Sequence, residues 1–168
     1  DLRLRDNPAL CCASDKGPVL PVFIDDPAMK PALGACSRVW LHHALHVLAE
    51  QLEGALVVGQ GDPLKLLTAW AARCGIKTVC WNRSYDPWVQ ARDERIKRGL
   101  EAAGLCVFEC DDALLWDPNT VAKKDGTPYK VFSFYKKACY AAPPPRALRK
   151  KPSITLVKRH GLNRSIAS

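Results

Sequence analysis

No run of about 18 or more apolar residues occurs in this chain of 168 residues, so the sequence predicts no membrane-spanning helix. The first residues also lack the apolar segment of a secretory signal peptide. We therefore expect a cytoplasmic, monomeric protein that makes no contact with a membrane. A hydrophobic content of 48% at this length suffices for one core, which predicts one domain followed by a tail.

Zinc-ligand spacing is absent from the eight cysteines, since pairs such as Cys106 and Cys110 do not form a CxxC motif. The cysteines lie in apolar runs or on predicted helices, which predicts buried, reduced thiols. His42 and His46 lie four residues apart on a predicted helix, but no acidic or thiol third ligand accompanies them. The sequence therefore predicts no metal site.

A catalytic motif is also absent. The segment 59–62 (GQGD) resembles a phosphate loop only weakly, because it completes neither the GxGxxG nor the Walker spacing. The carboxylate pairs Asp25/Asp26 and Asp111/Asp112 directly follow apolar runs, where such residues cap turns and helices. No Ser/His/Asp or Cys/His arrangement has a defensible spacing, so no catalytic residue is assigned.

Acidic residues are scarce at the carboxyl end of the chain. Residues 1–122 hold 13 basic and 16 acidic residues, whereas residues 123–168 hold 12 basic residues and Asp125 alone. The body is mildly acidic and the tail is strongly basic, with prolines that favour an extended segment. This tail is compatible with a solvated connector or with a nucleic-acid patch.

Apolar runs that alternate with helical patterns predict the fold. The runs cover 19–24, 55–58, 76–81 and 105–110, and helical spacing covers about 36–52, 63–74 and 88–103. Strands that are apolar on both faces and separated by helices are typical of a parallel sheet with right-handed crossovers. The predicted fold class is α/β, a Rossmann-like doubly wound parallel sheet with helices on both faces. Its ligands would bind at the carboxyl ends of the strands, near loops 25–34, 59–62 and 82–87.

The opening residues have the pattern of a strand-to-helix junction. Alternating apolar and charged residues lead into Asp6, Asn7 and Pro8, which suit the start of a helix, and no Met begins the chain. We therefore expect a fragment in which the first strand of the sheet is missing.

Four separated segments resemble the amino-terminal α/β domain of the DNA photolyase and cryptochrome family. They are DLRLRDNPAL at 1–10, WNRSYDPWVQARDERI at 81–96, DALLWDP at 112–118 and DGTPYKVFSFYKKAC at 125–139. The resemblance covers nearly the whole chain. It implies that residues 1–140 form this α/β domain and that residues 141–168 are a basic interdomain linker, truncated before a helical domain that binds FAD.

What the resemblance implies for this domain is light harvesting. In the full flavoprotein the helical domain binds FAD and UV-damaged DNA and carries out repair, whereas the α/β domain holds a second chromophore, a folate or a deazaflavin. That site needs a cleft, a planar group beside the heterocycle and a few hydrogen-bond partners. The candidate antenna residues are Asp25, Arg38, Asn82, Arg83, Tyr85 and Trp88.

Several alternatives stay open. Trp88 and Val89 occupy the Asn-Glu pair of enterobacterial folate sites, and the matching His falls near Leu33, which leaves a deazaflavin, a differently held folate or no antenna. The segment 129–132, followed by a proline-rich connector, is more similar to class I cyclobutane-dimer photolyases than to the DASH branch. A cryptochrome photoreceptor is a second possibility, and a stand-alone nucleotide-binding domain is disfavoured by the incomplete glycine motif. We expect that the fragment alone does not repair DNA.

Overall fold

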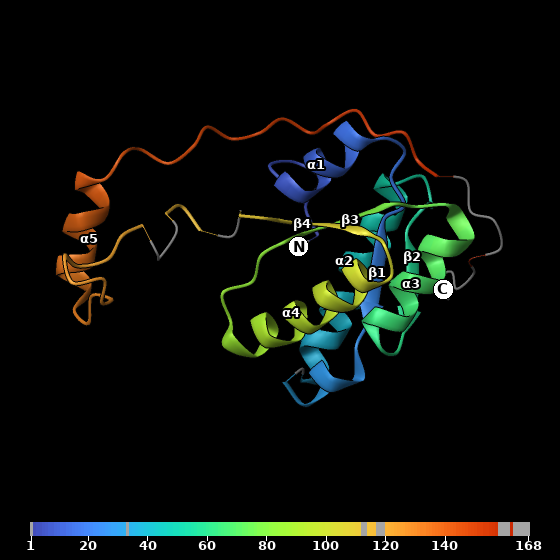
Figure 1. Cartoon of the computed structure of the whole chain (residues 1–168), viewed down its shortest axis with the longest axis horizontal. Helices are drawn as coiled ribbons and strands as arrows, with labels where there is room; N and C mark the ends of the chain where they lie inside the picture. Colours follow the sequence, from blue (N-terminus) through green and yellow to red (C-terminus); the bar gives the residue numbers. More distant parts are fainter. Residues whose placement is uncertain (1, 33, 112–113, 117–119, 158–161, 163–168) are drawn as a thin grey trace.

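A computed structural model describes residues 2–32, 34–111, 114–116, 120–157 and 162 (Figure 1). Leu33, Asp112, much of the predicted 112–118 segment and most of the tail after residue 157 lie outside the described residues. Within the described part of the chain, no helix has the length and apolar character needed to cross a membrane.

Helices and parallel strands alternate as the sequence predicts. The elements are α1 (Pro8–Lys16), β1 (Val22–Asp25), the 3-10 helix η1 (Pro27–Ala32), α2 (Ala35–Gln51), β2 (Val57–Gln60), α3 (Pro63–Cys74), β3 (Thr78–Asn82), α4 (Pro87–Ala102), β4 (Cys106–Cys110) and α5 (Phe132–Ala141). The predicted α/β class is therefore confirmed.

Three helices begin with the same local device, a polar cap followed by proline. The Asn7 side chain accepts a hydrogen bond from the Leu10 amide, and Asp62 and Asp86 cap α3 and α4 in the same way. Proline suits the next position because its fixed φ is already helical and its missing N–H would have had no helical partner. At the far end of α3, Gly75 adopts a φ of 65°, the left-handed conformation that ends helices.

The strands form two parallel pairs instead of one continuous sheet. β1 pairs with β2 from Val22↔Val57 to Asp25↔Gln60, and β3 pairs with β4 from Thr78↔Cys106 to Asn82↔Cys110. Among the described residues, β1 and β3 do not pair with each other. The predicted parallel pairing is correct, and the sheet is divided between β1 and β3.

Helices enclose the strands from both sides. Figure 1 shows α1 above and α4 below the β3–β4 pair, and both helices contact β4. α3 packs against α4. α5 lies apart from this body, and the extended segment that follows α5 leads back to the domain (Figure 1). This layering is that of the predicted doubly wound domain.

The main core lies between α2 and the β1–β2 pair. Leu45 and Leu48 of α2 are buried together with Leu52, which caps the end of α2, and with Leu56, which precedes β2. Leu41, which shares this helical spacing, is only half-buried. Partly buried residues that complete the cluster are Leu2, Leu4, Phe23, Ala49, Val58, Ile154 and Leu156.

The cysteines are free thiols in varied environments. Cys139 is buried, but Cys36 and Cys106 are exposed, so the prediction of buried thiols is wrong for these two. Cys36 lies in the first turn of α2, which faces solvent, and Cys106 begins β4 at the edge of its sheet. The Cys80 Sγ lies 3.8 Å from the Cys12 Sγ, and burial, followed by the neighbouring Cys12 thiol, raises the pKa of Cys80 to about 12.

The basic tail folds back onto the α/β domain. The Asp6 carboxylate accepts hydrogen bonds from Arg146 Nη1 at 2.6 Å and from the Arg149 amide at 2.9 Å. Val19 forms a parallel bridge with Leu156. The predicted boundary at residue 140 stays a prediction, but part of the segment interpreted as a linker packs against the core of the domain.

The Asp6→Asn variant should loosen this docking. The side-chain hydrogen bond from Arg146 and the hydrogen bond from the Arg149 amide, with the charges of Arg146 and Arg3, outweigh the opposing effect of desolvation and lower the pKa of Asp6 from 3.8. A carboxyl whose pKa is lowered by folding contributes stability above its unfolded pKa, and loses it as the pH falls through the folded pKa. We expect faster hydrogen exchange of the Arg149 and Val157 amides in the variant at neutral pH.

The control is Asp15→Asn, the same change on an exposed residue of α1. In the parent chain the protection of Arg149 should also decline as the pH falls below 3.8, whereas the Asp6→Asn variant should lack this acid-dependent step. Equal exchange in the parent and in the Asp6→Asn variant would show that Asp6 does not hold the tail.

Candidate functional site

A cleft lies where β1 and β2 end and α4 begins. Its volume is about 500 Å³, and its walls come from the segment after β1, the start of α3 and the first turns of α4. The lining residues are Asp26, Pro27, Ala28, Asp62, Pro63, Trp88, Ala91, Arg92 and Arg95. The cleft is therefore at the carboxyl ends of parallel strands, where doubly wound sheets bind ligands.

One wall is fixed by a buried carboxylate and an arginine. Asp26 is 8% exposed, and its Oδ1 accepts a hydrogen bond from the Ala28 amide at 3.0 Å. Its Oδ2 faces Arg92 Nη1 at 3.8 Å, and Arg92 also donates to Asp93 through Nε and Nη2, at 2.9 and 2.7 Å. The guanidinium is held between two carboxylates, which orients its plane at the cleft.

The opposite wall repeats this pairing. Asp62 Oδ1 accepts hydrogen bonds from the Leu64 and Lys65 amides, and its Oδ2 faces Arg95 Nη1 at 3.4 Å. Desolvation opposes ionisation of Asp62, but the two amides and Arg95 together lower its pKa. The carboxylate is therefore charged at neutral pH, where it both caps α3 and holds Arg95 beside the cleft.

Trp88 supplies the planar surface of the cleft. It lies in the first turn of α4, where its amide is bound by the Asp86 side chain, and its side chain is 76% exposed. Because the indole is open to solvent, a planar ligand can stack on its aromatic face without a rearrangement of the protein. The cleft thus combines an aromatic plane with two oriented guanidinium groups and two carboxylates.

The predicted antenna residues are divided by the structure. Trp88 lines the cleft, and Asp25 ends β1 next to it, where its Oδ2 accepts a hydrogen bond from Gln60 Nε2 at 3.0 Å. Asn82 and Arg83 line a different, larger cavity. Arg38 on α2 and Tyr85 on the loop before α4 line neither of these two spaces.

Asn82 and Arg83 have structural partners. Asn82 accepts a hydrogen bond from the Ala9 amide at 2.9 Å and donates one to the Asn7 side chain at 2.8 Å, which joins the end of β3 to α1. Arg83 pairs with Asp111 at 3.1 Å and faces Glu109 at 3.9 Å.

Four charged residues of the cleft, Asp26, Asp62, Arg92 and Arg95, were not predicted as site residues from the sequence. Asp26 was interpreted only as a cap of a turn or helix, and Asp62 only as the end of the GQGD segment, whereas both face arginines of α4. The spacing of the sequence could have identified the two arginines. Arg92 follows Trp88 by four residues and Arg95 follows Arg92 by three, so all three side chains lie on one face of the helix. No group of three or more His, Cys, Asp or Glu in the described ranges could hold a metal ion.

The fold and the cleft define a doubly wound α/β domain with a candidate ligand site at the carboxyl ends of its strands. The sequence model of the DNA photolyase family matches residues 1–153. The chain therefore belongs to the DNA photolyase family.

Known relatives include photolyases and cryptochromes. A deoxyribodipyrimidine photo-lyase of Agrobacterium fabrum is 39% identical over 163 residues, which cover 94% of this chain and 34% of the relative. Cryptochrome-2 of Arabidopsis thaliana is 30% identical, covering 83% of this chain and 24% of the relative. The crystal structure of a class III photolyase from Agrobacterium tumefaciens matches with a TM-score of 0.88 and 37% identity, over 95% of this chain and 34% of that chain. The chain thus spans about a third of the length of the two Agrobacterium photolyases and about a quarter of that of the cryptochrome.

Replacing Arg92 by alanine should destabilise the fold more than replacing Arg98. Arg92 faces the buried Asp26 carboxylate and bonds Asp93, whereas Arg98 bonds Glu94 on the same helix with its side chain 76% exposed. Losing hydrogen bonds to a charged, poorly solvated partner costs about 1–3 kcal/mol, while exposed pairs contribute roughly 0–1 kcal/mol. Urea denaturation of both variants measures the difference. Equal losses of stability would contradict the assigned role of Arg92.

Proposed function

We propose that this chain is the light-harvesting domain of a deoxyribodipyrimidine photolyase, and that its cleft holds an antenna pigment. The observation that carries the proposal is the position and make-up of the cleft. An exposed indole and two oriented arginines converge at the carboxyl ends of β1 and β2. Membership of the photolyase family supports it.

The residues of the cleft fit a planar heterocycle. A volume of about 500 Å³ is within the range of roughly 300–1,000 Å³ that is usual for small-molecule sites. Trp88 would stack on the ring system, and the guanidinium groups of Arg92 and Arg95 would face its carbonyl oxygens or an acidic substituent. A folate and a deazaflavin both present such rings. When bound, the pigment would supply absorption of light and transfer of the excitation to a flavin.

FAD binding and action on UV-damaged DNA are assigned to the part of the relatives that this chain does not cover. About two thirds of the length of the Agrobacterium photolyases lies outside the match. The branch within the family stays a prediction, because segment 129–132 favours class I whereas the matching structure from Agrobacterium tumefaciens is of class III.

A cryptochrome photoreceptor is the second candidate, since Arabidopsis thaliana cryptochrome-2 is 30% identical to this chain. The antenna proposal concerns the cleft and holds for either protein. Light-dependent reversal of pyrimidine dimers by the full-length protein distinguishes them, because a photolyase carries out this reaction and a photoreceptor without repair activity does not.

Trp88→Ala should release the pigment from the full-length protein. Loss of an aromatic partner removes about 1 kcal/mol beyond the buried area, which lowers pigment affinity roughly five-fold or more. Trp40→Ala is the matched control, because Trp40 is 68% exposed on α2 and does not line the cleft. The measurement is absorbance of released pigment, normalised to bound FAD. Equal retention in both variants would place the pigment elsewhere, and a parent without a second pigment would refute the antenna function.

The 168-residue chain by itself should show neither stable FAD binding nor light-driven dimer reversal. The reason is that FAD binding and repair are assigned to the part of the relatives that this chain does not cover, about two thirds of the length of the Agrobacterium photolyases. The test is purification in the presence of FAD, followed by absorbance and a repair assay under blue light. Repair by this chain alone would refute the assignment of the chemistry to another domain.

A further inference from the structure

Three cysteines lie together between α1 and the β3–β4 pair. Cys12 belongs to α1, Cys80 to β3, and Cys110 is the last residue of β4. The Cys80 thiol donates to the Cys12 Sγ over 3.8 Å, and Cys110 forms a side-chain hydrogen bond with the same Cys12. These three residues are called the thiol cluster below, and Cys12 is its centre.

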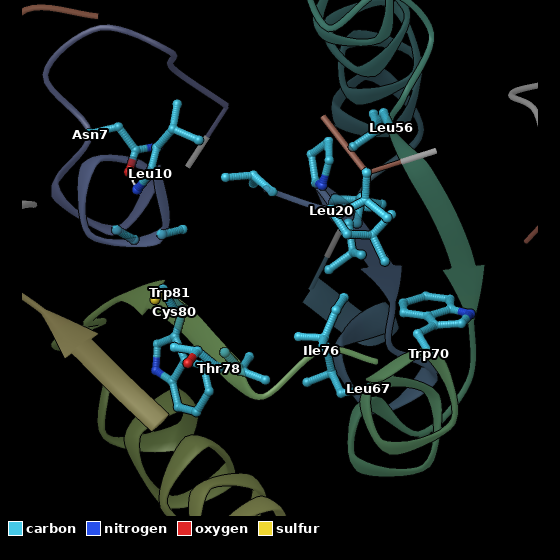
Figure 2. Close-up of a pocket in the computed structure, with 18 of the residues that line it drawn as sticks. Asn7, Leu10, Leu20, Leu56, Leu67, Trp70, Ile76, Thr78, Cys80 and Trp81 are labelled. Atoms are coloured by element: carbon cyan, nitrogen blue, oxygen red, sulfur yellow. Dashed lines mark hydrogen bonds between the residues drawn. The ribbon is translucent and has the colours of Figure 1, made fainter. Parts of the chain in front are cut away.

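The alternation of side chains along the strands directs this cluster toward α1. Successive residues of a strand point to opposite faces, so Cys80 and Asn82 share a face. Asn82 binds the Ala9 amide of α1, and its register partner on β4 is Cys110. Figure 2 shows Cys80 on the side of β3 that faces α1 and Trp81 on the opposite side.

Contacts on both sides of Cys12 fix α1 over this face. Before Cys12, the Asn82 side chain donates to the Asn7 side chain at 2.8 Å. After it, Lys16 Nζ lies 3.9 Å from the centroid of the Phe108 ring on β4. Because Cys12 lies between these two contacts, its sulfur is held over the strands.

Two members of the cluster are proton donors at neutral pH. Burial, followed by the neighbouring Cys12 thiol, raises the pKa of Cys80 to about 12 and that of Cys110 to about 11. Hydrogen bonds donated to a sulfur stabilise negative charge on it. The arrangement therefore assigns the nucleophile of the cluster to Cys12, with Cys80 as the neighbour that supplies a proton and a second sulfur.

Charged groups at the border of the cluster do not change this assignment. Lys16 of α1 favours the thiolate of Cys80, and Arg149 of the tail favours that of Cys110. The Asp111 carboxylate opposes the Cys110 thiolate. The net direction for both cysteines is upward, so burial outweighs the two cations.

Access to the cluster differs from access to the exposed cysteines. All three thiols of the cluster are half-buried, whereas Cys36 and Cys106 are exposed. Partial exposure admits a small oxidant and hinders a thiol of a second protein molecule. Oxidation at the cluster should therefore join sulfurs within one chain.

We propose that Cys12 is an oxidation site at which a hydroperoxide, such as hydrogen peroxide, closes a disulfide between Cys12 and Cys80. The bond would join α1 to β3, between residues 68 positions apart in the sequence. This inference is independent of the antenna proposal, because none of the three cysteines lines the smaller cleft.

The reaction has two steps. The Cys12 sulfur loses its proton and attacks one peroxide oxygen; the S–O bond forms, the O–O bond breaks, and the leaving hydroxide takes up the proton as water. The Cys80 sulfur then attacks the sulfenic sulfur of Cys12; the S–S bond forms, the S–O bond breaks, and the hydroxyl group leaves with the Cys80 proton as a second water. The two thiols lose two electrons, and the peroxide gains them.

The test treats the full 168-residue chain with hydrogen peroxide, blocks the remaining thiols by alkylation and maps the peptides by mass spectrometry without reduction. We expect a peptide pair joined through Cys12 and Cys80 as the main cross-link. The oxidised chain should also melt at least about 4 °C higher than the reduced chain, because a bond that closes a long loop restricts the unfolded state.

Serine variants test the role of each sulfur. Cys80→Ser should leave the sulfenic acid of Cys12 without its partner, so that dimedone labels Cys12 after peroxide treatment, whereas Cys12→Ser should give no dimedone label on Cys80. Cys74→Ser is the matched control, because Cys74 is also half-buried but lies on α3. It should retain both the cross-link and the rise in melting temperature.

The cross-link map of the parent chain decides the proposal even where a serine variant does not fold. Absence of the Cys12–Cys80 peptide pair would overturn it, and so would a Cys12–Cys110 bond in its place. Size-exclusion chromatography under non-reducing conditions adds a further condition. A cross-link that occurs only in dimers would join two molecules instead of α1 and β3, and would also overturn the proposal.

Discussion

Parallel strand pairing is the constraint on which the rest of this structure depends. Parallel neighbours cannot be joined by a tight turn, so each strand must be followed by a helix that returns the chain to the opposite end. The consequence is that β1, β2 and β3 all end where the next helix begins. Helix caps, loops and helix amino termini therefore gather at one edge, and the candidate cleft is formed there.

Capping residues and cleft residues are in part the same side chains. Asp62 caps α3 through the Leu64 amide while its other oxygen faces Arg95, and Asp26 accepts from the Ala28 amide while its other oxygen faces Arg92. A carboxylate has two oxygens, so one can satisfy the backbone while the second orients an arginine. Local helix initiation and the charge pattern of the site are thus coupled.

The tail and the division of the sheet show how strongly this fold depends on segments distant in sequence. Asp6 binds Arg146 and the Arg149 amide, which lie 140 and 143 residues further along the chain. Leu156 completes the core beside α2. Between β1 and β3, in contrast, no distant segment among the described residues pairs with the strands, and a cavity with a mainly apolar lining separates them.

Local patterns in the sequence determined most of the helices, the strands and their parallel class. The polar residues before Pro8, the helical spacing over about 36–52 and the apolar runs act over a few residues, so they can be interpreted without the fold. The division of the sheet and the docking of the tail were decided by tertiary structure. The make-up of the cleft was also decided by tertiary structure. Trp88 was predicted from the sequence and lines the cleft, whereas Asn82 was predicted for the same site and instead joins β3 to α1. The reason is that packing between elements, and not the neighbours in sequence, determines which side chains face a site.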